Sequence, residues 1–195
     1  MKNILLLISQ GSELLEIAPF TDVFGWNNIL SKDKICIKTC SFHSKISATW
    51  NVEITPEINL AEKTVDLDSF DAIVIPGGFG YRGFFNDMKL PQFIDIIQHF
   101  NKKHKTIAGI CTGAITLGEA GILTGKKATT YLYDNDRYHK QLKFYGAVPV
   151  KENIVIDENI ITVSGPKNAI DCAFLLLEIL TSKNNADIVK YNMGF

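Results

Sequence analysis

The sequence lacks the features that mark proteins acting at membranes or on nucleic acids. The apolar run at residues 4–8 is far shorter than the roughly 20 residues that a membrane-spanning helix needs, and it is typical of a buried strand. Neither sign of charge dominates, because 20 Lys and Arg stand against 21 Asp and Glu for a net charge of -1. We therefore expect no membrane or nucleic-acid partner.

Cysteine is scarce, and its spacing excludes the common cysteine-rich sites. The sequence has no CxxC pair and no histidine cluster near a cysteine, so we expect no zinc or other metal site and no metal cofactor. Cysteines without such patterns are typical of free thiols in a reducing compartment, so we expect the protein to be located in the cytoplasm. The four cysteines are Cys36, Cys40, Cys111 and Cys172.

The apolar pattern predicts an α/β fold. Hydrophobic residues make up 46% and charged residues 21% of the 195 residues, which suits one folded domain over residues 1–195. Apolar runs alternate with helical periodicity, which indicates a doubly wound, mostly parallel sheet sandwiched by helices. Residues 148–163 alternate and turn like a small antiparallel hairpin. The expected strands are 3–8, 34–41, 72–75, 106–110 and 160–163, and the expected helices are 13–30, 91–103, 112–120, 134–144 and 166–181.

The strongest chemical signal follows the predicted strand 106–110. Residues 109–113 read Gly-Ile-Cys-Thr-Gly, the pattern of a tight strand-to-helix turn that exposes a nucleophile, with cysteine at its centre. Cys111 then lies at a helix N-terminus, where the helix dipole favours the thiolate and is expected to lower the thiol pKa. A buried structural cysteine between two packing glycines is the simpler alternative.

Two further loops are expected at the same edge of the sheet, because the carboxyl ends of parallel strands meet there. The loop after residue 75 is rich in glycine, and we expect backbone amides around Gly77, Gly78 and Phe79, together with Thr112, to bind an anion or developing oxyanion. In the loop after the first strand, Glu16 falls among apolar residues, so burial is expected to raise its pKa and suit it to proton transfer. A glutamate at the surface or at the start of a helix is the alternative, and it is the interpretation we give Glu13.

The order of these motifs resembles the DJ-1/PfpI superfamily over nearly the whole chain. The resemblance rests on Glu16, on Pro-Gly-Gly at 76–78, on Ala-Gly-Ile-Cys-Thr-Gly at 108–113, and on the segment 121–130. It implies a flavodoxin-like fold, related to class I glutamine amidotransferases, and a homodimer. It also implies that Cys111 is the reactive cysteine and that Glu16 hydrogen-bonds to it. The motifs are most similar to those of isocyanide hydratases and of the DJ-1-like domains of AraC-type regulators.

Two departures from the family narrow the expected activity. PfpI-type proteases have His directly after the nucleophile, where this chain has Thr112, so protease activity is not expected. Many relatives also have His where this chain has Tyr131, which is a poor base near neutral pH. We expect the histidines to be solvated. His139 is the exception, because the segment that contains it could line the pocket together with Tyr131.

Three functions fit these residues. The first is a cysteine-dependent enzyme, of hydratase, lyase or hydrolase type, acting on a small electrophilic metabolite by isocyanide hydration or 2-oxoaldehyde chemistry. The second is a redox or stress sensor, in which an oxidant converts Cys111 to a sulfenic or sulfinic acid. The third is a regulatory domain that binds a small molecule. None of them requires a cofactor.

Overall fold

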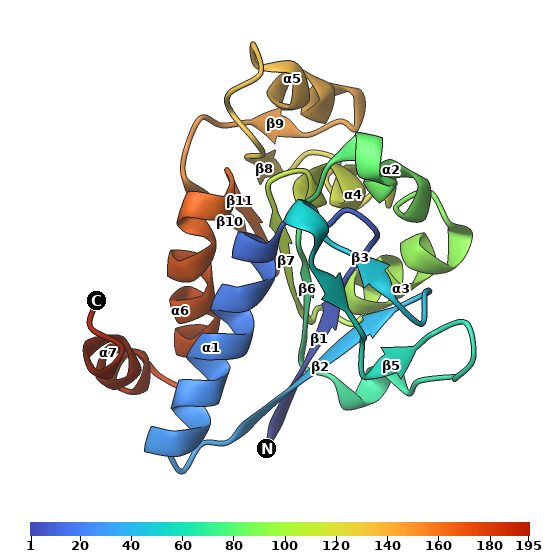
Figure 1. The fold of residues 1–195 in the computed structure, drawn as a ribbon. Helices are drawn as coiled ribbons and strands as arrows, with labels where there is room; N and C mark the ends of the chain where they lie inside the picture. The colour runs from blue at the N-terminus through green and yellow to red at the C-terminus, as the bar shows by residue number, and fades with distance from the viewer.

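The computed structural model describes all residues 1–195, and its centre is a seven-stranded sheet, which Figure 1 shows between layers of helices. The strand order is β10-β11-β7-β6-β1-β2-β5. Every neighbouring pair is parallel except β10 with β11. The strands are β1 (Lys2–Leu7), β2 (Ile35–Ser41), β5 (Ile58–Asn59), β6 (Ala72–Ile75), β7 (Thr106–Ile110), β10 (Ile154–Asp157) and β11 (Ile160–Val163).

Helices cover both faces of this sheet. On one face, α1 (Leu14–Leu30), α6 (Ala169–Leu180) and α7 (Lys183–Asn192) form one layer, and on the other lie α3 (Pro91–Lys102) and α4 (Gly113–Glu119) (Figure 1). Two short helices, α2 (Phe84–Asp87) and α5 (Arg137–Phe144), complete the set, and α5 lies beyond the carboxyl ends of the strands. The predicted doubly wound α/β fold is confirmed.

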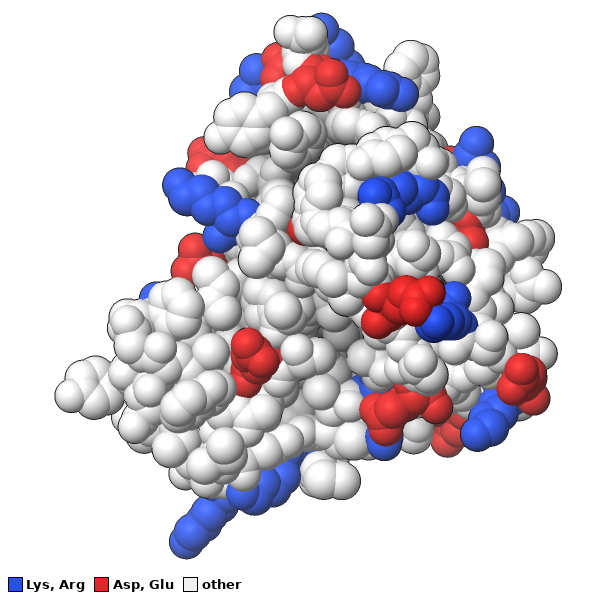
Figure 2. All heavy atoms as spheres, in the orientation of Figure 1, with Lys and Arg blue, Asp and Glu red and all other residues white.

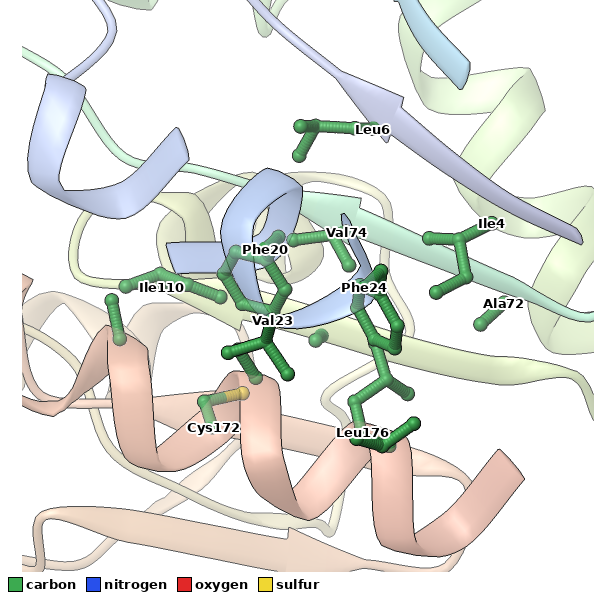
Figure 3. Packing of buried hydrophobic residues seen from close by; sticks show 14 of the residues in the cluster. Ile4, Leu6, Phe20, Val23, Phe24, Ala72, Val74, Ile110, Cys172 and Leu176 are labelled. Atoms are coloured by element: carbon green, nitrogen blue, oxygen red, sulfur yellow. The ribbon is translucent and has the colours of Figure 1, made fainter. Parts of the chain in front are cut away.

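The core divides into two hydrophobic clusters because strand side chains alternate between the faces of the sheet. Ile4 and Leu6 of β1 pack toward α1 and α6, whereas Leu5 and Leu7 pack toward α3 and α4. Figure 3 shows the first cluster, in which Phe20, Val23 and Phe24 of α1 and Cys172 and Leu176 of α6 meet the strands. Both faces of the central strands are buried, which explains their continuous apolar runs.

The predicted hairpin is present but lies later in the chain than its first residues suggested. The strands β10 and β11 form it, at 154–157 and 160–163. The preceding residues instead form β9 (Val148–Pro149), which pairs in parallel with β8 (Lys127–Ala128). A further antiparallel pair, β3 (Ile46–Ser47) with β4 (Glu53–Ile54), lies outside the main sheet.

The strand order explains where a site forms. The succession β2-β1-β6-β7-β11 is the flavodoxin order, in which the chain changes direction along the sheet between β1 and β6. Ligands bind at such a switch point, beyond the carboxyl ends of the strands. The loops after β1 and β6 are joined there, because the amide of Glu13 donates to the carbonyl of Gly77 at 2.9 Å and that of Phe79 to Gly11 at 3.0 Å.

The surface carries charges of both signs. Figure 2 shows Lys and Arg interspersed with Asp and Glu over the visible face, with no extended patch of one sign. No helix combines the length and the apolar character needed to cross a membrane. All four cysteines are free thiols.

Candidate active site

Cys111 lies in the turn between β7 and α4, in a left-handed backbone conformation with φ of +53°. A residue with a side chain adopts this conformation at a cost of about 1–3 kcal/mol, so the surroundings must hold it. The Cys111 amide donates to the carbonyl of Val163 at 2.7 Å, and the Thr130 hydroxyl donates to the Cys111 carbonyl at 2.6 Å. The predicted elbow is therefore present, and hydrogen bonds to the amide and to the carbonyl of Cys111 hold it in place.

Two glycines let the chain pass close to this elbow. A Cβ atom on Gly77 would lie 2.7 Å from the Thr112 hydroxyl and 2.8 Å from the Ile110 carbonyl. A Cβ atom on Gly113 would collide with the carbonyl of Ile75. The loop after β6 and the start of α4 thus approach each other more closely than any residue with a side chain permits.

Glu16 projects from the first turn of α1 and is fully buried. Its Oε2 atom accepts the Gly77 amide proton at 2.6 Å, while Oε1 is buried and has no partner with good hydrogen-bond geometry. Burial raises the pKa of this carboxyl from 4.5 to about 8, against the opposing effect of the Gly77 hydrogen bond. Near neutral pH, Glu16 is therefore mainly protonated.

The thiol of Cys111 interacts with the carboxyl of Glu16, and the two groups influence each other's titration. Burial, and then the charge of Glu16, raise the pKa of the Cys111 thiol well above its usual range, although the Thr112 amide donates to the sulfur and acts in the opposite direction. The expectation of a lowered thiol pKa is thus wrong. The neighbouring helix, α4, has only seven residues, and its dipole does not outweigh desolvation beside an acid.

The backbone amides expected to bind an anion already have partners within the protein. The Gly77 amide donates to Glu16, the Gly78 amide to the Thr112 hydroxyl at 2.8 Å, and the Phe79 amide to Gly11. The Thr112 amide points to the sulfur of Cys111. In this structure the glycine loop therefore holds Glu16 and Thr112 in place and does not form an open oxyanion hole.

A cavity of about 920 Å³ opens beside Cys111 and Glu16. Tyr131 lines this cavity, as the sequence suggested. Glu13, a buried residue that caps the start of α1, lines it as well. Much of its wall comes from segments whose positions the sequence did not reveal. The lining residues are Glu13, Glu16, Gly78, Phe79, Gly80, Tyr81, Phe85, Cys111, Thr112, Tyr131, Asp134, Arg137, Tyr138 and Pro166.

His139 does not join this cavity. It is buried rather than solvated, on the same inner face of α5 as Leu142, and it is not among the lining residues. The preceding residue, Tyr138, lines the cavity instead. One position along a helix turns the side chain by about 100°, and the sequence alone did not fix which side of α5 faces the cavity.

Comparisons with known proteins identify relatives of this chain. The family model described as the DJ-1/PfpI family matches residues 2–179. The isonitrile hydratase of Pseudomonas putida is 34% identical over 130 residues, which cover 67% of this chain and 54% of that enzyme. The match therefore spans only about half of the enzyme's length.

Two solved structures show the same fold. The crystal structure of Drosophila melanogaster DJ-1beta superposes with a TM-score of 0.83 at 26% identity, covering 98% of this chain and 97% of that one. An AraC family transcriptional regulator from Pseudomonas putida gives a TM-score of 0.81 at 15% identity, with both chains fully covered. Because the family model matches residues 2–179, this chain belongs to the DJ-1/PfpI family.

Proposed function

We propose that this protein is a cysteine-dependent enzyme that adds water to a small electrophilic carbon, with an organic isocyanide as the substrate. The observation that carries the proposal is the pairing of Cys111, at the strained elbow, with a buried carboxyl whose pKa is about 8. Both groups line one cavity large enough for a substrate. The similarity to an isonitrile hydratase supports this substrate class.

In the first step, the sulfur of Cys111 attacks the terminal carbon of the isocyanide, and a carbon–sulfur bond forms. The protonated Glu16 carboxyl gives its proton to the attacked carbon and takes up the thiol proton in exchange, which gives a thioimidate and leaves Glu16 protonated. Glu16 suits this transfer because its pKa of about 8 lies near the operating pH, where a group both accepts and donates a proton readily.

In the second step, water adds to the thioimidate carbon, and the carbon–sulfur bond breaks. One proton of the water reaches the nitrogen, the other returns to the sulfur through Glu16, and the product is an N-substituted formamide. Atoms balance as isocyanide plus water, with no oxidant, reductant or cofactor.

The occupied amides of the glycine loop favour this chemistry over attack on a 2-oxoaldehyde. A thiol that attacks a carbonyl creates an alkoxide, which needs free hydrogen-bond donors. The amides of Gly77, Gly78 and Phe79 already have partners. Attack on an isocyanide instead places the developing charge on carbon, where a proton from Glu16 neutralises it.

The test is the conversion of phenyl isocyanide to formanilide, followed by chromatography and corrected for the reaction without protein. Cys111→Ser and Glu16→Gln should each reduce kcat/KM by at least about a hundredfold, since a nucleophile or acid–base group is lost. Cys36→Ser is the matched control, because Cys36 is a half-buried thiol on β2 away from the cavity, and it should leave turnover unchanged. No formanilide above background with the wild type, or full turnover by Cys111→Ser, would overturn the proposal.

A second candidate function is oxidation of Cys111 by peroxide. The specific observation in its favour is the Oε1 atom of Glu16, which is buried without a partner. A protonated carboxyl there can donate to an oxygen added to the sulfur. Dilute peroxide should then add one or two oxygen atoms at Cys111, as shown by intact mass and peptide mapping, and equal oxidation of Cys36 would contradict this function.

The proposed assembly is a homodimer. Supporting it, three large apolar side chains in the last two turns of α1, Trp26, Ile29 and Leu30, are exposed in the single chain. Light scattering coupled to size-exclusion chromatography should give twice the chain mass of 21.7 kDa. A single-chain mass at micromolar concentration would contradict it.

A further inference from the structure

Five aromatic rings from four separate segments line the cavity. Phe79 and Tyr81 come from the loop after β6, Phe85 from α2, Tyr131 from the loop after β8, and Tyr138 from α5. They are in contact as pairs. The ring centroids of Phe79 and Tyr81 are 5.6 Å apart, those of Phe85 and Tyr138 are 6.2 Å apart, and those of Tyr131 and Tyr138 are 6.4 Å apart.

Tyr138 is the ring that joins these segments. It lies between Phe85 and Tyr131, and the guanidinium of Arg137 is 5.2 Å from its ring centroid. Tyr138 is also close enough to Cys111 for the charge of the thiolate to influence its titration. Its ring therefore has aromatic neighbours on two sides and lines the same cavity as Cys111.

These rings are only partly covered by the rest of the protein. Phe85, Tyr131 and Tyr138 are half-buried, and each lines the open volume. Aromatic rings prefer offset or edge-to-face contact with another ring, and such a pair contributes beyond its buried area. A ligand ring that enters the cavity can therefore make such contacts with the aromatic side chains of the wall, which are already spaced as interacting ring pairs.

The size of the cavity also points away from the smallest substrates. A volume of about 920 Å³ is in the range of pockets that bind whole drug-sized ligands. Two charged groups of the wall compensate each other, because Arg137 lies 3.8 Å from the carboxylate of Asp134. A ligand in the cavity therefore meets mainly aromatic side chains.

We infer that the site takes substrates whose reactive carbon bears an aromatic group, and that Tyr138 is the residue that selects this group. The inference rests on the proposed function for the identity of the reactive carbon. It assigns the ring-lined wall to the substituent of the substrate and leaves Cys111 and Glu16 for the chemistry. Substrates with a small alkyl group leave most of the wall without contacts.

The experiment measures binding without turnover, by calorimetry on the Cys111→Ser protein. Three stable amides serve as probes: formanilide, N-cyclohexylformamide and N-methylformamide. Formanilide should bind at least tenfold more tightly than N-methylformamide, since even one added methylene in an apolar pocket is worth about tenfold. It should also bind about threefold more tightly than the cyclohexyl amide, which has similar bulk but no aromatic face.

Two further substitutions in the Cys111→Ser background locate the determinant. Tyr138→Ala should weaken formanilide binding about tenfold and leave N-methylformamide binding unchanged. Phe144→Ala is the matched control, because Phe144 is an aromatic residue of the same helix that is 89% exposed and outside the cavity, and it should change neither affinity.

Equal affinity for formanilide and the cyclohexyl amide, or unchanged formanilide binding in the Tyr138→Ala protein, would overturn the inference. The proposed function fails separately. Tight formanilide binding combined with a wild-type protein that does not hydrate phenyl isocyanide would contradict the function and leave the aromatic site standing.

Discussion

Replacing Glu16 by glutamine should change how the stability of the protein depends on pH. The folded protein holds the Glu16 proton up to a pKa of about 8, whereas the unfolded chain releases it near 4.5. Between these values the folded state binds more protons than the unfolded state, so its stability falls as pH rises. The stability that the bound proton of Glu16 contributes to the folded protein is fully present below pH 4.5 and is lost as the pH rises through 8.

The size of this effect follows from the displacement of the pKa. Each unit corresponds to about 1.4 kcal/mol, so the change from 4.5 to about 8 bounds the loss at about 5 kcal/mol. Glutamine has nearly the same shape, keeps an oxygen to accept the Gly77 amide proton, and does not ionise. Glu16→Gln should therefore match the wild type at low pH and become progressively more stable than it toward pH 8.5.

The assay is urea unfolding of both proteins between pH 5 and 8.5. The difference in unfolding free energy is the quantity to follow, because groups that titrate alike in both proteins cancel in it. An increase of several kcal/mol in favour of Glu16→Gln is expected. A difference that does not change with pH, or that changes in the opposite direction, would refute the assignment of a buried, proton-bearing carboxyl.

Two substitutions test the packing around the elbow. Gly77→Ala should destabilise the protein by about 1–3 kcal/mol in urea unfolding, because the new Cβ would lie 2.7 Å from the Thr112 hydroxyl. Gly25→Ala, in α1 with nothing within 4 Å of the new Cβ, is its control and should stabilise by about 0.5–1 kcal/mol; similar losses for both would contradict the packing. Thr130→Val should cost about 1–3 kcal/mol, since it leaves the Cys111 carbonyl without its 2.6 Å donor, and an unchanged unfolding midpoint would rule out this clamp.

The sequence predicted the parts of the fold that have strong local signals. The runs 72–75 and 107–110 are continuously apolar, and the central strands that contain them, β6 and β7, have the expected bounds of 72–75 and 106–110. The short pairs β3 with β4 and β8 with β9 were not predicted, because two-residue strands have no periodicity to detect. Helix α7 was also missed, since its pattern is mostly polar.

The site was predictable where a motif fixes the backbone. The glycines around Cys111 predicted the elbow, and the strand order brings Glu16 to it across the switch point. The thiol pKa was not predictable, because it depends on how deeply the thiol itself is buried and then on the charge of the neighbouring carboxyl. Tyr138 was missed for a different reason, since the rotation of α5 depends on tertiary packing.

The coupling of Cys111 to Glu16 is tested most directly by the rate at which iodoacetamide alkylates Cys111, measured by peptide mass as a function of pH. The two groups titrate together, so the wild type should show a first rise near pH 8 as the pair loses one proton, and a second at higher pH. Glu16→Gln should show a single rise, at a lower pH than the second wild-type step, because the negative charge that disfavours the thiolate is gone. Superimposable profiles for the two proteins would contradict the account.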